Sequence, residues 1–129
     1  FYTGKESPNN GERRFYGYSR AWMHHKGRNK HHFEYWYDYD LVTKQLVPVD
    51  MPDRYIKEMF CDRVAASKIY NGKSYSQKDP FLYLTKSSAR EKMTDSTYRK
   101  LFFLLNMLGE KGERETLAFI RKAKRLPLE

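Results

Sequence analysis

The sequence has one cysteine, Cys61, and no apolar run close to the ~18 residues that a membrane-spanning helix needs. One cysteine excludes an internal disulfide framework and fits a reducing compartment, so we expect a cytoplasmic protein with no membrane partner. The opening residues carry no signal-peptide pattern. Phosphate-loop, dinucleotide-binding and serine-elbow motifs are also missing, as are the motifs of known nucleic-acid-binding folds. Function must therefore be inferred from composition and from the clustering of side chains.

The chain is rich in positive charge and in aromatic rings. Its 129 residues contain 25 lysines and arginines against 16 acids, a net charge of +9. Such an excess favours anionic partners, namely nucleic acid, nucleotides or phosphorylated small molecules, although a solvated basic surface gives the same count. A hydrophobic content of 40%, with 16% aromatic, is too high for a disordered chain despite a mean hydropathy of −0.91. Length and composition predict one domain over residues 1–129.

Hydrophobic periodicity predicts a mainly α-helical fold of about five helices. Four of the helices are expected over residues 12–26, 79–89, 94–108 and 113–126. The second helix is expected between Asp50 and Gly72, with its periodic apolar face over residues 55–70. A small β-hairpin is expected near residues 35–49, with Val42 on one strand and a turn around Thr43-Lys44. Capping preferences predict that Asp50 caps the second helix and that Gly109 ends the fourth.

Two charged residues interrupt the apolar face of the helix expected over residues 55–70. On a wheel of ~100° per residue this face extends to Ile69 and Tyr70, and Asp62 and Arg63 fall on the same side. A buried carboxylate without a partner is costly. Asp62 is therefore expected to meet a cation, a hydrogen-bond donor or a metal ion.

All four histidines fall between positions 24 and 32, as two adjacent pairs between Trp22 and Trp36. Imidazole is the commonest metal ligand in proteins, and a carboxylate from another element often completes such a site. The sequence predicts a divalent metal ion of unknown identity, with ligands drawn from His25, His31, His32 and Asp62. Neighbouring side chains would hold a phosphorylated small molecule or nucleotide: His24, Arg28, Asn29, Arg63 and Lys68.

Other interpretations of the same residues stay open. Histidine pairs beside aromatic rings also cap helices and bond backbone carbonyls without a metal, and surface histidines often have no special role. Cys61 stands beside Asp62, a poor neighbour for a thiolate, so we expect a packing cysteine and not a nucleophile. The competing function is a non-catalytic basic module that binds nucleic acid or a protein partner.

Two blocks of the sequence resemble a family of bacteria and phages, domain of unknown function 5662. The first block runs from Ala21-Trp22-Met23-His24-His25 through Arg28-Asn29-Lys30-His31-His32 to Tyr35-Trp36. The second runs from Met51-Pro52 through Cys61-Asp62-Arg63 to Gly72. The resemblance covers most of residues 1–90, and the last two helices carry little of it.

Members of that family usually have an N-terminal helical segment with a His-Asp-x-Ser-Lys motif, which this chain lacks. The chain opens on Phe1-Tyr2-Thr3 without a methionine, so we expect that a natural N-terminal segment is missing. That motif, followed by a His-His segment and a later helical aspartate, is similar to the ligand order of His-Asp-type metal-dependent phosphohydrolases. The resemblance implies that His25, His31 or His32 and Asp62 occupy the later ligand positions of such an enzyme, whose substrate it does not name.

Overall fold

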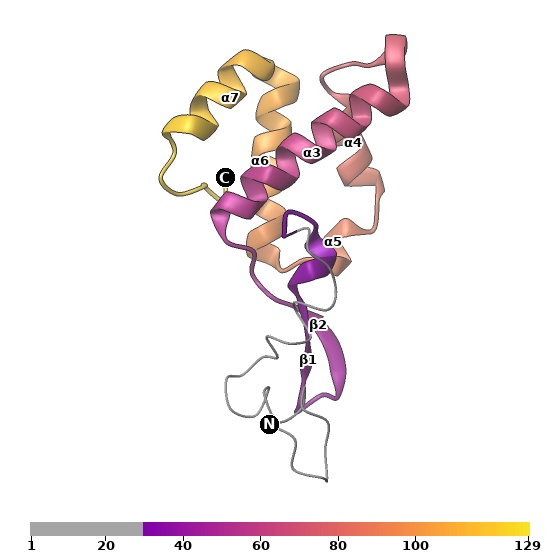
Figure 1. Cartoon of the computed structure of the whole chain (residues 1–129), viewed down its shortest axis with the longest axis vertical. Helices are drawn as coiled ribbons and strands as arrows, with labels where there is room; N and C mark the ends of the chain where they lie inside the picture. The colour runs from indigo at the N-terminus through magenta and orange to yellow at the C-terminus, as the bar shows by residue number, and fades with distance from the viewer. Residues whose placement is uncertain (1–29) are drawn as a thin grey trace.

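The computed structural model describes residues 30–129, and the helix expected over residues 12–26 lies outside them. The described part contains five α-helices and a two-stranded antiparallel sheet, which confirms the predicted mainly helical fold (Figure 1). No helix in this part is both long and apolar enough to cross a membrane. The elements in chain order are η1 (Phe33–Trp36), β1 (Tyr37–Asp40), β2 (Gln45–Pro48), α3 (Asp53–Asn71), η2 (Gly72–Ser74), α4 (Asp79–Lys86), α5 (Ala89–Lys92), α6 (Asp95–Lys111) and α7 (Glu113–Lys122).

The hairpin of β1 and β2 extends away from the helices (Figure 1). Its last pair is Asp40 opposite Gln45, so the turn lies between these residues. The Val42 amide donates a hydrogen bond to the Asp40 carboxylate at 2.8 Å, and the Lys44 amide donates to the Asp40 carbonyl at 2.8 Å. Lys44 has a φ of 63°, in the left-handed region that many hairpin turns require. The hairpin expected at residues 35–49 is confirmed, but Val42 lies in the turn and not in a strand.

The hydrophobic core is centred on α6, against which α3, α4, α5 and α7 all pack. Four leucines at three- and four-residue steps on this helix are fully buried: Leu101, Leu104, Leu105 and Leu108. Burial of each such side chain contributes about 1.5–3 kcal/mol. The Thr94 hydroxyl accepts a hydrogen bond from the Thr97 amide at 3.2 Å and caps the helix, so the predicted start of α6 is confirmed.

Several predicted helix boundaries are wrong. α6 runs through Gly109 and ends at Gly112, whose φ of +89° favours glycine. Asp50 is not the cap of α3, which follows Pro52 without a side-chain capping bond. The helix expected over residues 79–89 is divided into α4 and α5, because Ser87 has an extended backbone. α7 ends at Lys122, four residues earlier than predicted.

The chain after α7 returns to the start of α3 and fastens it. Asp53, the first residue of α3, accepts hydrogen bonds from the Lys100 ammonium at 2.7 Å and from the Leu126 amide at 2.9 Å. The Lys57 ammonium donates to the Ala123 carbonyl at 2.8 Å. These bonds join α3 and α6 to the C-terminal segment, and they fix the helix on which the candidate site is built.

The buried residues of α3 are Ile56, Met59, Phe60 and Val64, and none lies beyond Val64. The later turns of α3 extend past α6 and lie along α4 (Figure 1). Ile69 is 84% exposed and Tyr70 is 91% exposed, so the apolar face predicted for the whole helix is wrong. The Asp62 side chain is 49% exposed, so it does not lie among the buried residues of α3 as its place on the apolar face predicted.

Candidate functional site

His31 and His32 lie in the segment that leads into η1, and an aromatic contact holds this segment on α3. The Trp36 indole N–H donates a hydrogen bond to the Lys30 carbonyl at 2.7 Å. The Trp36 ring packs against Tyr55 of α3 with a centroid distance of 5.6 Å. Trp36 thus links both the backbone before the histidines and the helix that faces them.

Asp62 of α3 faces both imidazoles. Its Oδ2 is 3.3 Å from Nε2 of His32, and its Oδ1 is 3.9 Å from Nε2 of His31. The two rings lie nearly edge to face, with an interplanar angle of 82°. One donor atom from each residue lies within 4.8 Å of the others. The structure therefore gathers three of the four predicted metal ligands into one group, the His–Asp cluster, and metal binding by this cluster stays a prediction.

The donor atoms of the His–Asp cluster are of the types that a divalent ion binds, and one of the two histidine–carboxylate distances already fits. Two ligands that bind one ion at ~2.0–2.2 Å lie about 3.0–3.5 Å apart. The His32–Asp62 distance of 3.3 Å already fits, whereas the His31–Asp62 distance of 3.9 Å must shorten. Both distances are also those of an imidazole–carboxylate ion pair when a ring is protonated, so the same geometry can serve a protonated pair or a bound ion.

A shallow hollow of about 470 Å³ adjoins the cluster and is lined by His31, Lys57, Glu58, Cys61 and Asp62. Glu58 precedes Asp62 by one helical turn, so their carboxylates share a face of α3. Burial raises the pKa of the Cys61 thiol, and the charges of Glu113 and Glu58 raise this pKa further. Cys61 is exposed, so the expectation of a packing cysteine is wrong, and its raised pKa keeps the thiol protonated at neutral pH.

Arg63 is half-buried on the neighbouring face of α3, toward α4. Burial lowers the pKa of its guanidinium, while Tyr83, Glu34 and Asp62 act in the opposite direction. An arginine pKa starts far above neutral, so the lowered value still leaves the group charged at neutral pH. Within residues 30–129 this guanidinium has no hydrogen bond or ion pair, which leaves its charge available to a ligand.

The remaining predicted substrate-binding residues are placed differently. The Lys68 ammonium donates to both carboxylate oxygens of Glu113 at 2.9 Å, and this interaction raises the pKa of Lys68. Lys68 thus joins α3 to α7, and a substrate would have to displace Glu113 to reach it. Four other predicted residues lie outside the described part of the chain: His24, His25, Arg28 and Asn29.

The model of a family of unknown function, DUF5662, matches residues 1–107 of the 129. The chain belongs to the DUF5662 family. No curated protein and no solved structure matches it. In this DUF5662 chain the match includes the His–Asp cluster and Arg63, and it reaches into α6, beyond the residues 1–90 on which the sequence resemblance rested.

Sequence reasoning gave no site role to Glu58, Tyr70 or Tyr83 of this DUF5662 chain. Tyr70 belongs to the predicted apolar face of the helix, although its ring is almost fully exposed. Tyr83 lies off the stripe of α4 that buries Pro80 and Leu84, and it is 70% exposed. A large aromatic residue on the polar face of a helix was the signal that could have identified it.

Proposed function

We propose that this DUF5662 protein binds a divalent transition-metal ion through His31, His32 and Asp62 and acts as a metal-dependent phosphohydrolase on a phosphorylated small molecule. The observation that carries the proposal is the convergence of one donor atom from each of these residues within 4.8 Å. A bound ion at such a cluster can lower the pKa of a water molecule and polarise a phosphoryl oxygen. The order of ligand types, similar to that of His-Asp-type phosphohydrolases, supports the choice of reaction, and His25 is the candidate for a further ligand.

The surrounding side chains supply the other requirements of phosphate hydrolysis. Glu58 lines the same hollow as His31 and Asp62, so its carboxylate is the candidate acceptor for a proton from the attacking water. Arg63 forms no ion pair within residues 30–129, and its guanidinium on the adjacent face would hold the phosphate. The net charge of +9 favours the approach of an anionic substrate.

Calorimetric titration of the metal-free full chain with Zn²⁺ or Mn²⁺ tests the metal site. We expect one saturable site whose affinity falls by more than about 100-fold in His32→Ala and in Asp62→Asn. Loss of a residue that only hydrogen-bonds a metal ligand lowers metal affinity by about 10- to 100-fold, and loss of the ligand itself should cost more. Asp50→Asn, which changes an exposed aspartate outside the cluster, is the matched control and should keep full affinity. Equal affinity in Asp62→Asn and Asp50→Asn would refute the site.

The reaction is tested separately, by phosphate release from a panel of nucleoside monophosphates and sugar phosphates in the presence of the metal that binds. We expect release that depends on the metal and is lost in Asp62→Asn and in Glu58→Gln, with metal affinity retained in Glu58→Gln. Metal binding without hydrolysis of any member of the panel would leave a metal site and reject the phosphohydrolase.

A second candidate function, nucleic-acid binding, is favoured by a basic segment at the end of α7. Its four cations are exposed and form no ion pair within the described residues: Arg121, Lys122, Lys124 and Arg125. Binding through phosphate contacts weakens steeply with salt. Titration with single-stranded RNA at several salt concentrations tests this function, and no measurable affinity at low salt would reject it.

A further inference from the structure

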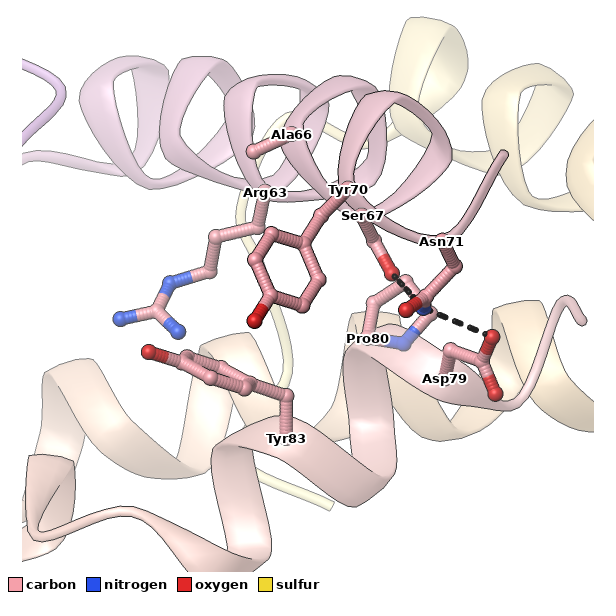
Figure 2. Close-up of a pocket in the computed structure, with 8 residues that line it drawn as sticks. All are labelled: Arg63, Ala66, Ser67, Tyr70, Asn71, Asp79, Pro80 and Tyr83. Carbon is pink, nitrogen blue, oxygen red and sulfur yellow. Dashed lines mark hydrogen bonds between the residues drawn. The ribbon is translucent and has the colours of Figure 1, made fainter. Parts of the chain in front are cut away.

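A hollow of about 440 Å³ lies between α3 and α4, on the face of α3 next to the His–Asp cluster (Figure 2). Its size is within the range of about 300–1,000 Å³ that is usual for small-molecule sites. Three polar groups gather at one end. Figure 2 shows the Arg63 guanidinium, the Tyr70 hydroxyl and the Tyr83 hydroxyl directed toward the same end of the hollow. A guanidinium with phenol donors beside it suits a phosphate, which accepts several hydrogen bonds.

The walls of this hollow are aromatic and exposed. Tyr70 projects from α3 and Tyr83 from α4, and their rings are 91% and 70% exposed. Exposure of an aromatic face to water is unfavourable, and stacking of a planar ring on that face is favourable because it buries this surface. Arg63 can also contribute to stacking, because its planar guanidinium packs face to face on rings. The hollow therefore suits an anion that is attached to a flat ring.

The other end of the hollow offers hydrogen-bond acceptors. The Asn71 amide nitrogen donates to Asp79 Oδ2 at 3.0 Å and to the Ser67 hydroxyl at 3.5 Å (Figure 2). Asp79 Oδ2 also accepts from the Ser76 amide at 2.9 Å. In the part of the chain that the structure describes, Asp79 Oδ1 and the side-chain oxygen of Asn71 form no further hydrogen bond, so both can accept from a ligand. With the Arg63 guanidinium at one end and the Asp79 carboxylate at the other, the hollow suits a molecule that has a phosphate at one end and N–H donors at the other.

We propose that the hollow between α3 and α4 binds a nucleoside monophosphate, with its phosphate on Arg63 and its base between Tyr70 and Tyr83. The amino or imino N–H groups of the base would donate to Asp79 and Asn71. As a binding site it requires no metal. As the substrate site of a phosphohydrolase it rests on the proposed function, and it would place the phosphate on the side of α3 adjacent to Asp62.

The probe is AMP, compared with adenosine and with inorganic phosphate, titrated calorimetrically into the full chain in the presence of EDTA. We expect AMP to bind more tightly than either fragment, because the guanidinium and the rings act on one molecule. Arg63→Gln should weaken AMP binding by about 10- to 100-fold, the usual value of a hydrogen bond to a charged group. Tyr83→Ala should weaken it by about tenfold or more through lost stacking, while Tyr83→Phe keeps the ring and most of the affinity.

Control variants distinguish a specific AMP-binding site from non-specific attraction of an anion to a basic protein. Arg114→Gln removes the same charge from an exposed position of α7 and should leave AMP affinity within about twofold. Arg63→Lys keeps the charge without the planar fork and should give intermediate affinity, and it decides the question if Arg63→Gln fails to fold. Asp62→Asn should weaken metal binding and leave AMP affinity unchanged, whereas Arg63→Gln should weaken AMP binding and leave metal affinity unchanged.

Three results would overturn the proposal. They are AMP binding no tighter than phosphate, equal losses in Arg63→Gln and Arg114→Gln, and no saturable AMP binding at millimolar concentration. AMP binding that survives in a chain without any metal affinity would support this site and reject the proposed phosphohydrolase. The two hypotheses can therefore fail separately.

Discussion

Asp53→Asn tests how the start of α3 is held in place. The Asp53 carboxylate accepts hydrogen bonds from the Lys100 ammonium at 2.7 Å and the Leu126 amide at 2.9 Å, so it connects α3, α6 and the C-terminal segment. Asparagine keeps the shape and can still accept the Leu126 bond, but it removes the charge that faces Lys100. A hydrogen bond between charged groups contributes about 1.5–3 kcal/mol. Because the two side chains are 23% and 21% exposed, we expect a loss near the lower end, about 1–2 kcal/mol.

The pH dependence of that loss has a definite sign. Burial alone would raise the pKa of Asp53, but the hydrogen bonds from Lys100 and Leu126 and the charges of Lys100 and Lys57 outweigh burial and lower this pKa. A carboxyl whose pKa is lower in the folded state stabilises the fold above its unfolded pKa of about 3.9. The stabilisation disappears as the pH falls through the lowered folded value. The difference between the parent and Asp53→Asn should be constant above about pH 5 and shrink below pH 4.

The assay is urea unfolding of the full chain, followed by circular dichroism at pH 7, 5 and 3.5. Asp50→Asn is the matched control, since Asp50 is exposed and lies three residues before Asp53. We expect Asp50→Asn to stay within about 0.5 kcal/mol of the parent at every pH. Equal stability of the two variants at pH 7, or a loss in Asp53→Asn that does not change with pH, would refute the reasoning.

Three further predictions concern elements near the site. Thr94→Ala removes the α6 cap and should lower the free energy of unfolding in urea by about 1 kcal/mol. Thr85→Ala, at an exposed position of α4, is the control and should be near-neutral; equal effects of the two variants would contradict the cap. Gly112→Ala should cost about 1–2 kcal/mol in the same assay because of the φ of +89°, and an unchanged midpoint would contradict it. The rate at which iodoacetamide alkylates Cys61 should have a pH midpoint above that of free cysteine, and Glu58→Gln should lower this midpoint. A midpoint below that of free cysteine would contradict the raised pKa of the thiol.

The helices could be predicted where their signals are local. The leucines of α6 recur at helical spacing and Thr94 precedes them, so both the helix and its start follow from neighbouring residues. The end of α6 does not, because Gly109 and Gly112 are both glycines near the expected end. Only Gly112 adopts a positive φ, of +89°, whereas a Cβ at Gly109 would make ordinary van der Waals contact with Lys78. No local pattern in the sequence distinguishes the two glycines.

The residues of the candidate site could be predicted from the sequence, but their exposure to solvent could not. His31 and His32 are adjacent in the sequence, and Asp62 is a charged residue on the predicted apolar face of a helix, so these three residues could be named as one group. The exposure of Asp62 was not predictable, because it depends on how far α3 extends past α6. The hollow at Arg63 also depends on the packing of α4, since Tyr83 reaches it from an element that carries no motif.

The central claim is that one ion can sit between the imidazoles and Asp62. Diffraction at the zinc absorption edge, from crystals of the full chain grown with zinc, tests it most directly. The account predicts one strong anomalous peak about 2.0–2.2 Å from an Asp62 oxygen and from a ring nitrogen of His31 or His32. A structure with no peak there, and with both rings turned to solvent while Asp62 bonds elsewhere, would contradict it.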